Sequence, residues 1–145
     1  MSAGICIIAH EPLASALKSC ARHIFSATGD TFCDSIAVFD VPCDVDAEQG
    51  EAEARRLISN FPANQDGLVF TDGLGATPSN IAHRLLDNPQ VRVITGVNLP
   101  ALITALSHHE ECAARIAVIA EGAARGGIST SCGKPSAIKD TVNAD

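Results

Sequence analysis

The chain has 145 residues and a formal charge of −7, and 46% of its residues are apolar. This length suits one compact domain, and the apolar fraction is enough for a single core. Five Phe and no Trp or Tyr leave few rings for stacking on bases, and the negative charge repels phosphate backbones. Both features argue against nucleic-acid binding.

Six cysteines are present, but no two form a CxxC pair and no His lies at a zinc-like spacing from them. Cys6 lies in an apolar strand and Cys20 on the apolar stripe of a helix, so we expect them to be small buried hydrophobes. The sequence has neither a signal-peptide pattern nor an apolar run of about 18 residues. These features predict a reduced, cytoplasmic protein that does not insert into a membrane.

The first half of the chain alternates apolar runs with amphipathic segments. Residues 4–9 form a continuous apolar run, typical of a strand buried on both faces of a parallel sheet. Apolar residues then recur at helical spacing over residues 13–24, with Pro12 in the first turn. Residues 35–39 indicate a second strand, and residues 54–61 mark a second helix. Two strand–helix units follow one another.

The second half repeats this pattern. Residues 67–71 indicate a third strand, and the helix after it is predicted to have Thr77 as its cap and Pro78 as its first residue. A fourth strand is predicted over residues 91–95 and a fourth helix over residues 99–106. The chain therefore contains four successive strand–helix units.

A fifth helix is predicted over residues 110–124, where Ala and Glu are plentiful. The whole pattern predicts an α/β fold of three layers, with a mainly parallel four-stranded sheet and helices on both faces. We expect the strand order 2-1-3-4, one domain over residues 1–130, and a polar, flexible tail over residues 131–145.

Unusual residues follow three of the predicted strands, at 10–12, 71–80 and 96–98. Ligands of open α/β sheets bind beyond the carboxyl ends of the strands. His10 lies between a strand and a helix start, where backbone N–H groups favour anions. This position fits two interpretations: a polar residue where the strand ends, or a neutral imidazole that attacks a phosphoryl group.

Asp72 occupies the matching position after the third strand. If the first and third strands are neighbours, its carboxylate can fix the tautomer of His10 and leave the other ring nitrogen as a nucleophile. The alternative is an ordinary Asp-Gly turn. The loop that follows lacks both the GxGxxG pattern and the Lys of a P-loop, so no nucleotide cofactor is expected.

Glycines and hydroxyl groups in this loop allow a ligand to approach the backbone closely. The candidates for lining a phosphate pocket are Gly73, Gly75, Thr77, Ser79 and Asn98. The adjacent His108 and His109 point in different directions on a helix, so they cannot easily converge on one ion. We therefore expect no metal site.

Three segments together resemble the enzyme IIA domain of the mannose family of the bacterial phosphoenolpyruvate:sugar phosphotransferase system. They are residues 4–10 (GICIIAH), 71–80 (TDGLGATPSN) and 95–100 (TGVNLP), and the resemblance extends over residues 3–127. It implies a phosphocarrier in which His10 is phosphorylated, Asp72 orients the ring, and the loop around Thr77 lines the pocket.

The resemblance also implies partners. The family accepts phosphate from the phosphocarrier HPr and passes it to a IIB component, without a metal or a nucleotide. Its members are homodimers, in which a C-terminal strand crosses to the partner's sheet. In this chain that strand would lie near residues 126–131.

The chain departs from the family pattern at two positions. Glu11 stands where a small residue is common, and Ala76 stands where a second glycine is usual. We expect the Glu11 carboxylate to face solvent, because it would repel a phosphoryl group on His10. Two alternatives remain open: a regulatory module whose phosphorylation state is sensed, and a phosphoryl donor to dihydroxyacetone kinase, although residues 77–80 look more like the sugar-system branch.

Overall fold

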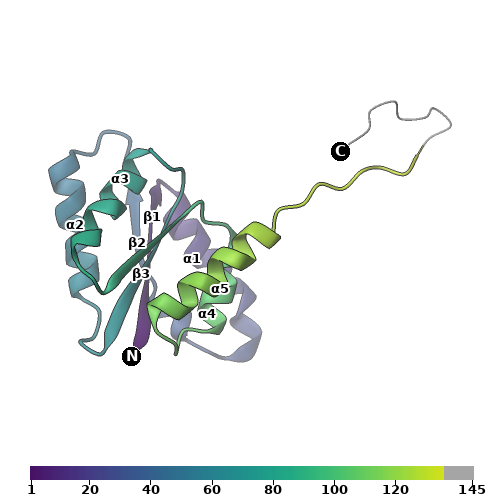
Figure 1. The fold of residues 1–145 in the computed structure, drawn as a ribbon, viewed down its shortest axis with the longest axis horizontal. Helices are drawn as coiled ribbons and strands as arrows, with labels where there is room; N and C mark the ends of the chain where they lie inside the picture. Colours follow the sequence, from purple (N-terminus) through teal and green to yellow (C-terminus); the bar gives the residue numbers. More distant parts are fainter. Residues whose placement is uncertain (136–145) are drawn as a thin grey trace.

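The computed structural model describes residues 1–135. Figure 1 shows a central sheet with helices packed on both of its faces. The strands are β1 (Ser2–His10), β2 (Ala37–Val41), β3 (Gln65–Thr71) and β4 (Val91–Thr95). The helices are α1 (Leu13–Ile24), α2 (Ala47–Ser59), α3 (Thr77–His83), α4 (Leu99–Ser107) and α5 (Ala113–Gly126). Short 3₁₀ turns lie at Ser26–Thr28, Phe32–Ser35 and Arg84–Asp87.

The sheet is parallel throughout and has the order β2-β1-β3-β4. The predicted fold class and strand order are confirmed. β1 is central, and its apolar run is buried from Ala3 to Ala9. A strand covered on both faces needs such a run, since neither face meets water. The carboxyl ends of β1 and β3 therefore lie side by side at one edge of the sheet.

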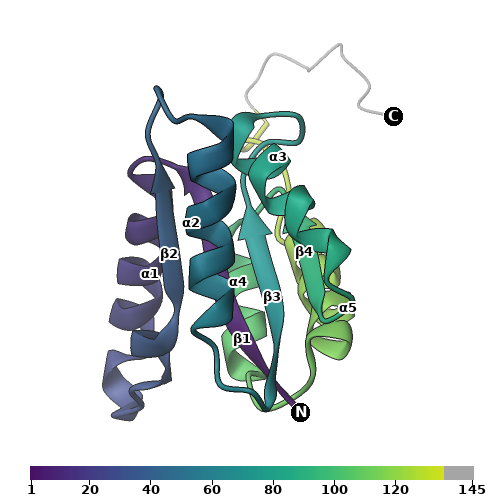
Figure 2. The same cartoon turned by 90° about the vertical axis from the view of Figure 1, so that its left-hand side faces the viewer.

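Two apolar clusters hold the layers together. On one face, α1, α4 and α5 pack on the sheet around Ile7 and Phe70, which are fully buried. On the other face, α2 and α3 pack around Ile8 and Val69. Figure 2 shows α2 and α3 lying over the second face. Residues adjacent in a strand point to opposite faces, which places successive apolar residues in different clusters.

Several predicted boundaries were wrong. β2 begins at Ala37 and continues to Val41, because a 3₁₀ turn occupies Phe32–Ser35. Thr77 is the first residue of α3 rather than its cap; Ala76 holds the N-cap position, and no side chain caps this helix. α5 begins at Ala113 rather than at residue 110, and Asp66 of β3 accepts the N–H of that first residue.

One further expectation was also wrong. Cys20 is exposed, because the buried stripe of α1 consists of Ala14, Leu17 and Ala21, and Cys20 lies beside that stripe. In the single chain, α5 extends through Gly126 and residues 128–135 carry no regular secondary structure. The crossing strand expected near residues 126–131 requires a partner's sheet, so it stays a prediction. The last ten residues of the predicted tail, 136–145, lie outside the described part of the chain.

Candidate functional site

His10 and Asp72 meet at the carboxyl edge of the sheet. His10 is the last residue of β1, and Asp72 directly follows β3. The two strands are hydrogen-bonded neighbours, with Ile8 opposite Thr71. This register brings residues 62 positions apart in the sequence to one point. The structure therefore brings His10 and Asp72 together, as expected from their positions at the ends of two strands.

One carboxylate oxygen of Asp72 contacts His10 twice. Oδ2 accepts the backbone N–H of His10 at 2.9 Å and lies 2.7 Å from Nδ1 of the ring. An ionised carboxylate only accepts hydrogen bonds, so this contact assigns the proton to Nδ1. The other ring nitrogen, Nε2, is then unprotonated in the neutral ring and makes no hydrogen bond within residues 1–135. Nε2 is therefore available as a nucleophile.

The two side chains differ in exposure. The imidazole of His10 is 56% exposed, whereas the Asp72 side chain is only 14% exposed. Oδ1 of Asp72 is buried and has no hydrogen-bond partner among the described residues. The carboxylate is thus shielded from water and directs its hydrogen bonding at His10, which leaves an accessible ring held in a fixed orientation.

The loop after Asp72 forms a tight turn beside this pair. The Ala76 N–H donates to the Gly73 carbonyl at 3.2 Å, and Gly75 has a φ of +85°, a conformation that favours glycine. In the described part of the chain, no hydrogen bond occupies the backbone N–H groups of Leu74, Gly75 or Thr77. These groups are donors that an anion can use.

The other predicted pocket residues are placed differently from one another. Thr77 is exposed, whereas Ser79 is fully buried and its hydroxyl lies 3.3 Å from Nδ1 of His83. Asn98 caps α4: its side-chain oxygen accepts the Ala101 N–H at 3.0 Å, and its amide donates to the carbonyl of Ala124. Gly73 and Gly75 are thus exposed on the loop and Thr77 is exposed at the start of α3, while Ser79 and Asn98 are engaged within the fold.

Sequence reasoning missed one contact at this edge of the sheet. Asp40 of β2 accepts hydrogen bonds from both the backbone N–H and the hydroxyl of Ser15 in the first turn of α1. The available signal was Pro12, which precedes α1 and has no side chain able to cap it. A helix start without a local cap requires an acceptor from elsewhere in the fold.

Within residues 1–135 we find neither a metal-binding cluster nor a membrane-spanning helix. No group of three His, Cys, Asp or Glu side chains within residues 1–135 is arranged to hold a metal ion. Nδ1 of His108, at the end of α4, lies instead 2.8 Å from Glu111. In the same part of the chain, none of the helices has the length and apolar character needed to cross a membrane.

The fold and the His–Asp pair define a parallel α/β domain with an accessible, carboxylate-oriented histidine at its carboxyl edge. Residues 4–123 match the family model EIIA-man, described as the PTS system fructose IIA component. The protein therefore belongs to the EIIA-man family, the mannose-type IIA components of the phosphotransferase system, and is a phosphotransfer protein of that system. No curated protein matches the sequence.

Solved structures support the fold. A mannose/sorbose-specific IIA subunit from Enterococcus faecalis is 20% identical, with a TM-score of 0.79 over 94% of this chain and 99% of its own. A IIA protein associated with the fucose utilization operon of Streptococcus pneumoniae is 24% identical, with a TM-score of 0.67 over 84% of this chain and 93% of its own. A sigma-54 interaction domain protein from Enterococcus faecalis is 14% identical, with a TM-score of 0.69 over 87% and 93%.

Proposed function

We propose that this chain is a cytoplasmic phosphocarrier in sugar uptake. His10 accepts a phosphoryl group from the phosphohistidine of an HPr-type protein and passes it to a IIB component. The observation that supports this most directly is the 2.7 Å contact between Nδ1 of His10 and Oδ2 of Asp72. It leaves Nε2 unprotonated on a ring that a partner protein can reach.

The transfer proceeds by in-line displacement. The lone pair of Nε2 attacks phosphorus, a new N–P bond forms, and the N–P bond of the donor histidine breaks, so that its electron pair returns to the donor ring. The His10 ring gains positive charge as the bond forms. Asp72 stabilises that charge through the Nδ1–H hydrogen bond, which becomes stronger as the ring becomes cationic.

The phosphoryl oxygens need donors as well. The N–H groups of Leu74, Gly75 and Thr77 and the exposed Thr77 hydroxyl supply them. Ser79 and Asn98 support the pocket from within the fold, since Ser79 is a buried residue of α3 and Asn98 caps α4. No metal or nucleotide takes part, because donor and acceptor are both phosphoproteins.

A labelling experiment tests this function. The chain is incubated with phosphoenolpyruvate, enzyme I and HPr, and we expect one acid-labile phosphate per chain in the wild type and none in His10→Ala. His83→Ala is the matched control, because His83 lies on α3 and bonds the Ser79 carbonyl rather than Asp72. Undiminished labelling of His10→Ala excludes the proposed function. Candidate IIB proteins, added afterwards, should remove the label.

A second candidate function is regulatory. The similarity in fold to a sigma-54 interaction domain protein is the observation that favours it. In that case the phosphorylation state of His10 is read by a kinase or a transcription regulator, and the label is not passed to any IIB protein. Retention of the label in the presence of IIB proteins, with binding to a regulator that depends on phosphorylation, supports this alternative.

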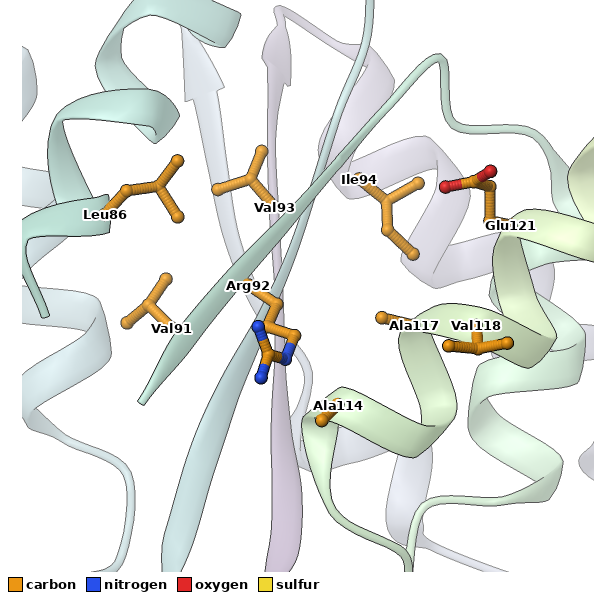
Figure 3. A pocket seen from close by; sticks show the side chains of 9 residues that line it. All are labelled: Leu86, Val91, Arg92, Val93, Ile94, Ala114, Ala117, Val118 and Glu121. Carbon is orange, nitrogen blue, oxygen red and sulfur yellow. The ribbon is translucent and has the colours of Figure 1, made fainter. Parts of the chain in front are cut away.

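We also propose that the chain forms a homodimer through β4 and α5. β4 is hydrogen-bonded only to β3 within residues 1–135, so its other edge is open. Beside it lies a groove of about 570 Å³, lined by residues of β4 and α5 (Figure 3). Leu86 and Val118 line this groove with exposed apolar side chains, and exposed Ile128 lines a second groove with Thr95 and Gly96. An open strand beside an apolar groove suits a crossing strand from a second copy.

The dimer is tested by substitution in the groove. Val118, on α5, is 75% exposed, so Val118→Asp should leave the fold intact while placing a charge in the interface. Sedimentation should show a dimer for the wild type and a monomer for this variant. Ile24→Asp is the control, because Ile24 is also an exposed apolar residue but lies on α1. A monomeric wild type refutes the dimer.

A further inference from the structure

The start of α1 is held by a residue from another strand. Pro12 occupies the N-cap position and forms no side-chain capping bond. Asp40 of β2 supplies the acceptor: Oδ1 accepts the Ser15 N–H at 3.0 Å, and Oδ2 accepts the Ser15 hydroxyl. Both oxygens of one carboxylate are thus bound to the first turn of α1. The helix that follows His10 is therefore capped from the neighbouring strand.

This cap lies next to the His10 segment in the sheet. β1 and β2 are parallel, with His10 opposite Val41, the residue after Asp40. The Glu11 N–H donates to the Val41 carbonyl at 3.1 Å. Only two residues separate His10 from the start of α1. The His10 segment is thus held by Asp72 on the β3 side, and by the Glu11 bond and the Asp40 cap on the β2 side.

We propose that Asp40 is a positioning residue for phosphoryl transfer, an inference that rests on the proposed function of His10. By capping α1, Asp40 holds the chain that leaves β1, so that the backbone N–H and Nδ1 of His10 stay aligned on Asp72. Without this acceptor the Ser15 N–H and hydroxyl lose their partner and the helix start frays. The two residues that join the helix to His10 then move more freely.

Amide hydrogen exchange measures this effect directly. The His10 N–H donates to Asp72, so its exchange reports on the alignment of the pair and needs no phosphoryl donor. In Asp40→Ala we expect exchange at His10 and Glu11 to become about fivefold faster, the change expected from the loss of one helix cap. Phosphoryl transfer from HPr should slow by about twofold or more in kcat, with KM unchanged.

Asp46→Ala is the matched control. Asp46 is the N-cap of α2 at the same edge of the sheet, and it accepts the Gln49 N–H at 3.2 Å. Its substitution removes a cap of the same kind from a helix that does not follow His10. We expect the free energy of unfolding to fall as much in Asp46→Ala as in Asp40→Ala, while exchange at His10 and the rate of transfer stay at wild-type values. Asp40→Asn should restore both, because an asparagine oxygen also caps helices.

The inference is overturned if Asp40→Ala leaves exchange at His10 unchanged, or if Asp46→Ala alters it equally. Ser15→Ala, which deletes only the hydroxyl bond, should give a smaller change in the same direction, so the inference stays testable even where Asp40→Ala does not fold. If the wild type accepts no phosphate while Asp40→Ala still accelerates exchange at His10, the proposed function fails and the structural coupling stands.

Discussion

Asp72→Asn is the perturbation that separates the charge of the carboxylate from its shape. Oδ2 of Asp72 accepts both hydrogen bonds from His10, while Oδ1 is buried without a partner. If the asparagine oxygen takes the Oδ2 position, both bonds persist to a neutral acceptor and the amide NH₂ is buried without a partner. If the amide is flipped, NH₂ faces the two donors of His10, and the ring must move its proton to Nε2, the nucleophile.

Either orientation weakens phosphoryl transfer. A hydrogen bond to a charged group contributes ~1.5–3 kcal/mol and a neutral one ~0.5–1.5 kcal/mol, so the cationic ring loses ~1–2 kcal/mol of stabilisation. This corresponds to a rate reduced by about five- to thirtyfold. The NH₂ replaces an Oδ1 that is already unpartnered, so the free energy of unfolding falls by at most ~1–3 kcal/mol, which is less than the ~5–15 kcal/mol typical of a domain. The variant should remain folded.

Rapid-quench measurement of transfer from phosphorylated HPr, with circular dichroism to verify the fold, checks this prediction. Asp66→Asn is the control: Asp66 lies at the opposite end of β3 and accepts the Ala113 N–H through both oxygens at 3.0 Å. Asp66→Asn removes the same charge at the other end of β3, and transfer should keep its wild-type rate. Wild-type kinetics in Asp72→Asn, or equal slowing in both variants, refutes a specific role for Asp72.

Three further predictions concern other residues. Glu11 is exposed beside His10, so its charge can contact a docking partner. Glu11→Lys should change kcat/KM for HPr by about threefold or more at low salt, and high salt should reduce this difference. A change that does not depend on salt would count against a docking role for Glu11. Burial raises the pKa of the Cys6 thiol from 9.0 to about 12, so the thiol ionises at lower pH in the unfolded chain than in the folded one. The free energy of unfolding, measured by denaturant titration, should therefore fall as pH rises from 9.0 toward about 12. In Cys6→Ala this fall should be less steep. A Cβ at Gly4 would lie 2.6 Å from the Phe61 ring, so Gly4→Ala should destabilise the domain by ~1–3 kcal/mol, whereas Gly122→Ala, in open space on α5, should not; equal melting temperatures for the two variants would contradict this.

The sequence was sufficient for the order of elements and for the central pair of the site. The apolar run of β1 and that of β3 have the composition of buried parallel strands, and their ends carry His10 and Asp72. Topology then brings these ends together, because β1 and β3 are neighbours in the sheet. The pair was predictable because each residue directly follows a recognisable strand.

Side-chain partners between elements were not predictable in the same way. The contact between Asp40 and Ser15 depends on β2 extending to Val41, whereas the apolar pattern ended that strand at residue 39. Cys20 was predicted to be buried because it is apolar, yet small Ala21 takes the place nearest the sheet. Such details depend on the phase of a helix against its sheet, and local pattern does not determine that phase.

Thr77 shows a related difficulty. A threonine before a proline is a typical pattern for an N-cap followed by the first helical residue. In the structure Ala76 adopts the extended N-cap conformation instead, and α3 begins one residue earlier than predicted. The tight turn between Gly73 and Ala76 sets this start. Thr77 is consequently exposed in the first turn of α3, and its hydroxyl forms no capping bond.

The state of the His10 ring after phosphorylation tests the central claim most directly. Nitrogen and phosphorus NMR of the chain, phosphorylated by phosphoenolpyruvate, enzyme I and HPr, identifies which ring nitrogen is bonded to phosphorus and which carries a proton. The contact between Nδ1 and Asp72 predicts phosphate on Nε2 and a proton on Nδ1 of His10. Phosphate on Nδ1, or on any residue other than His10, would contradict the account.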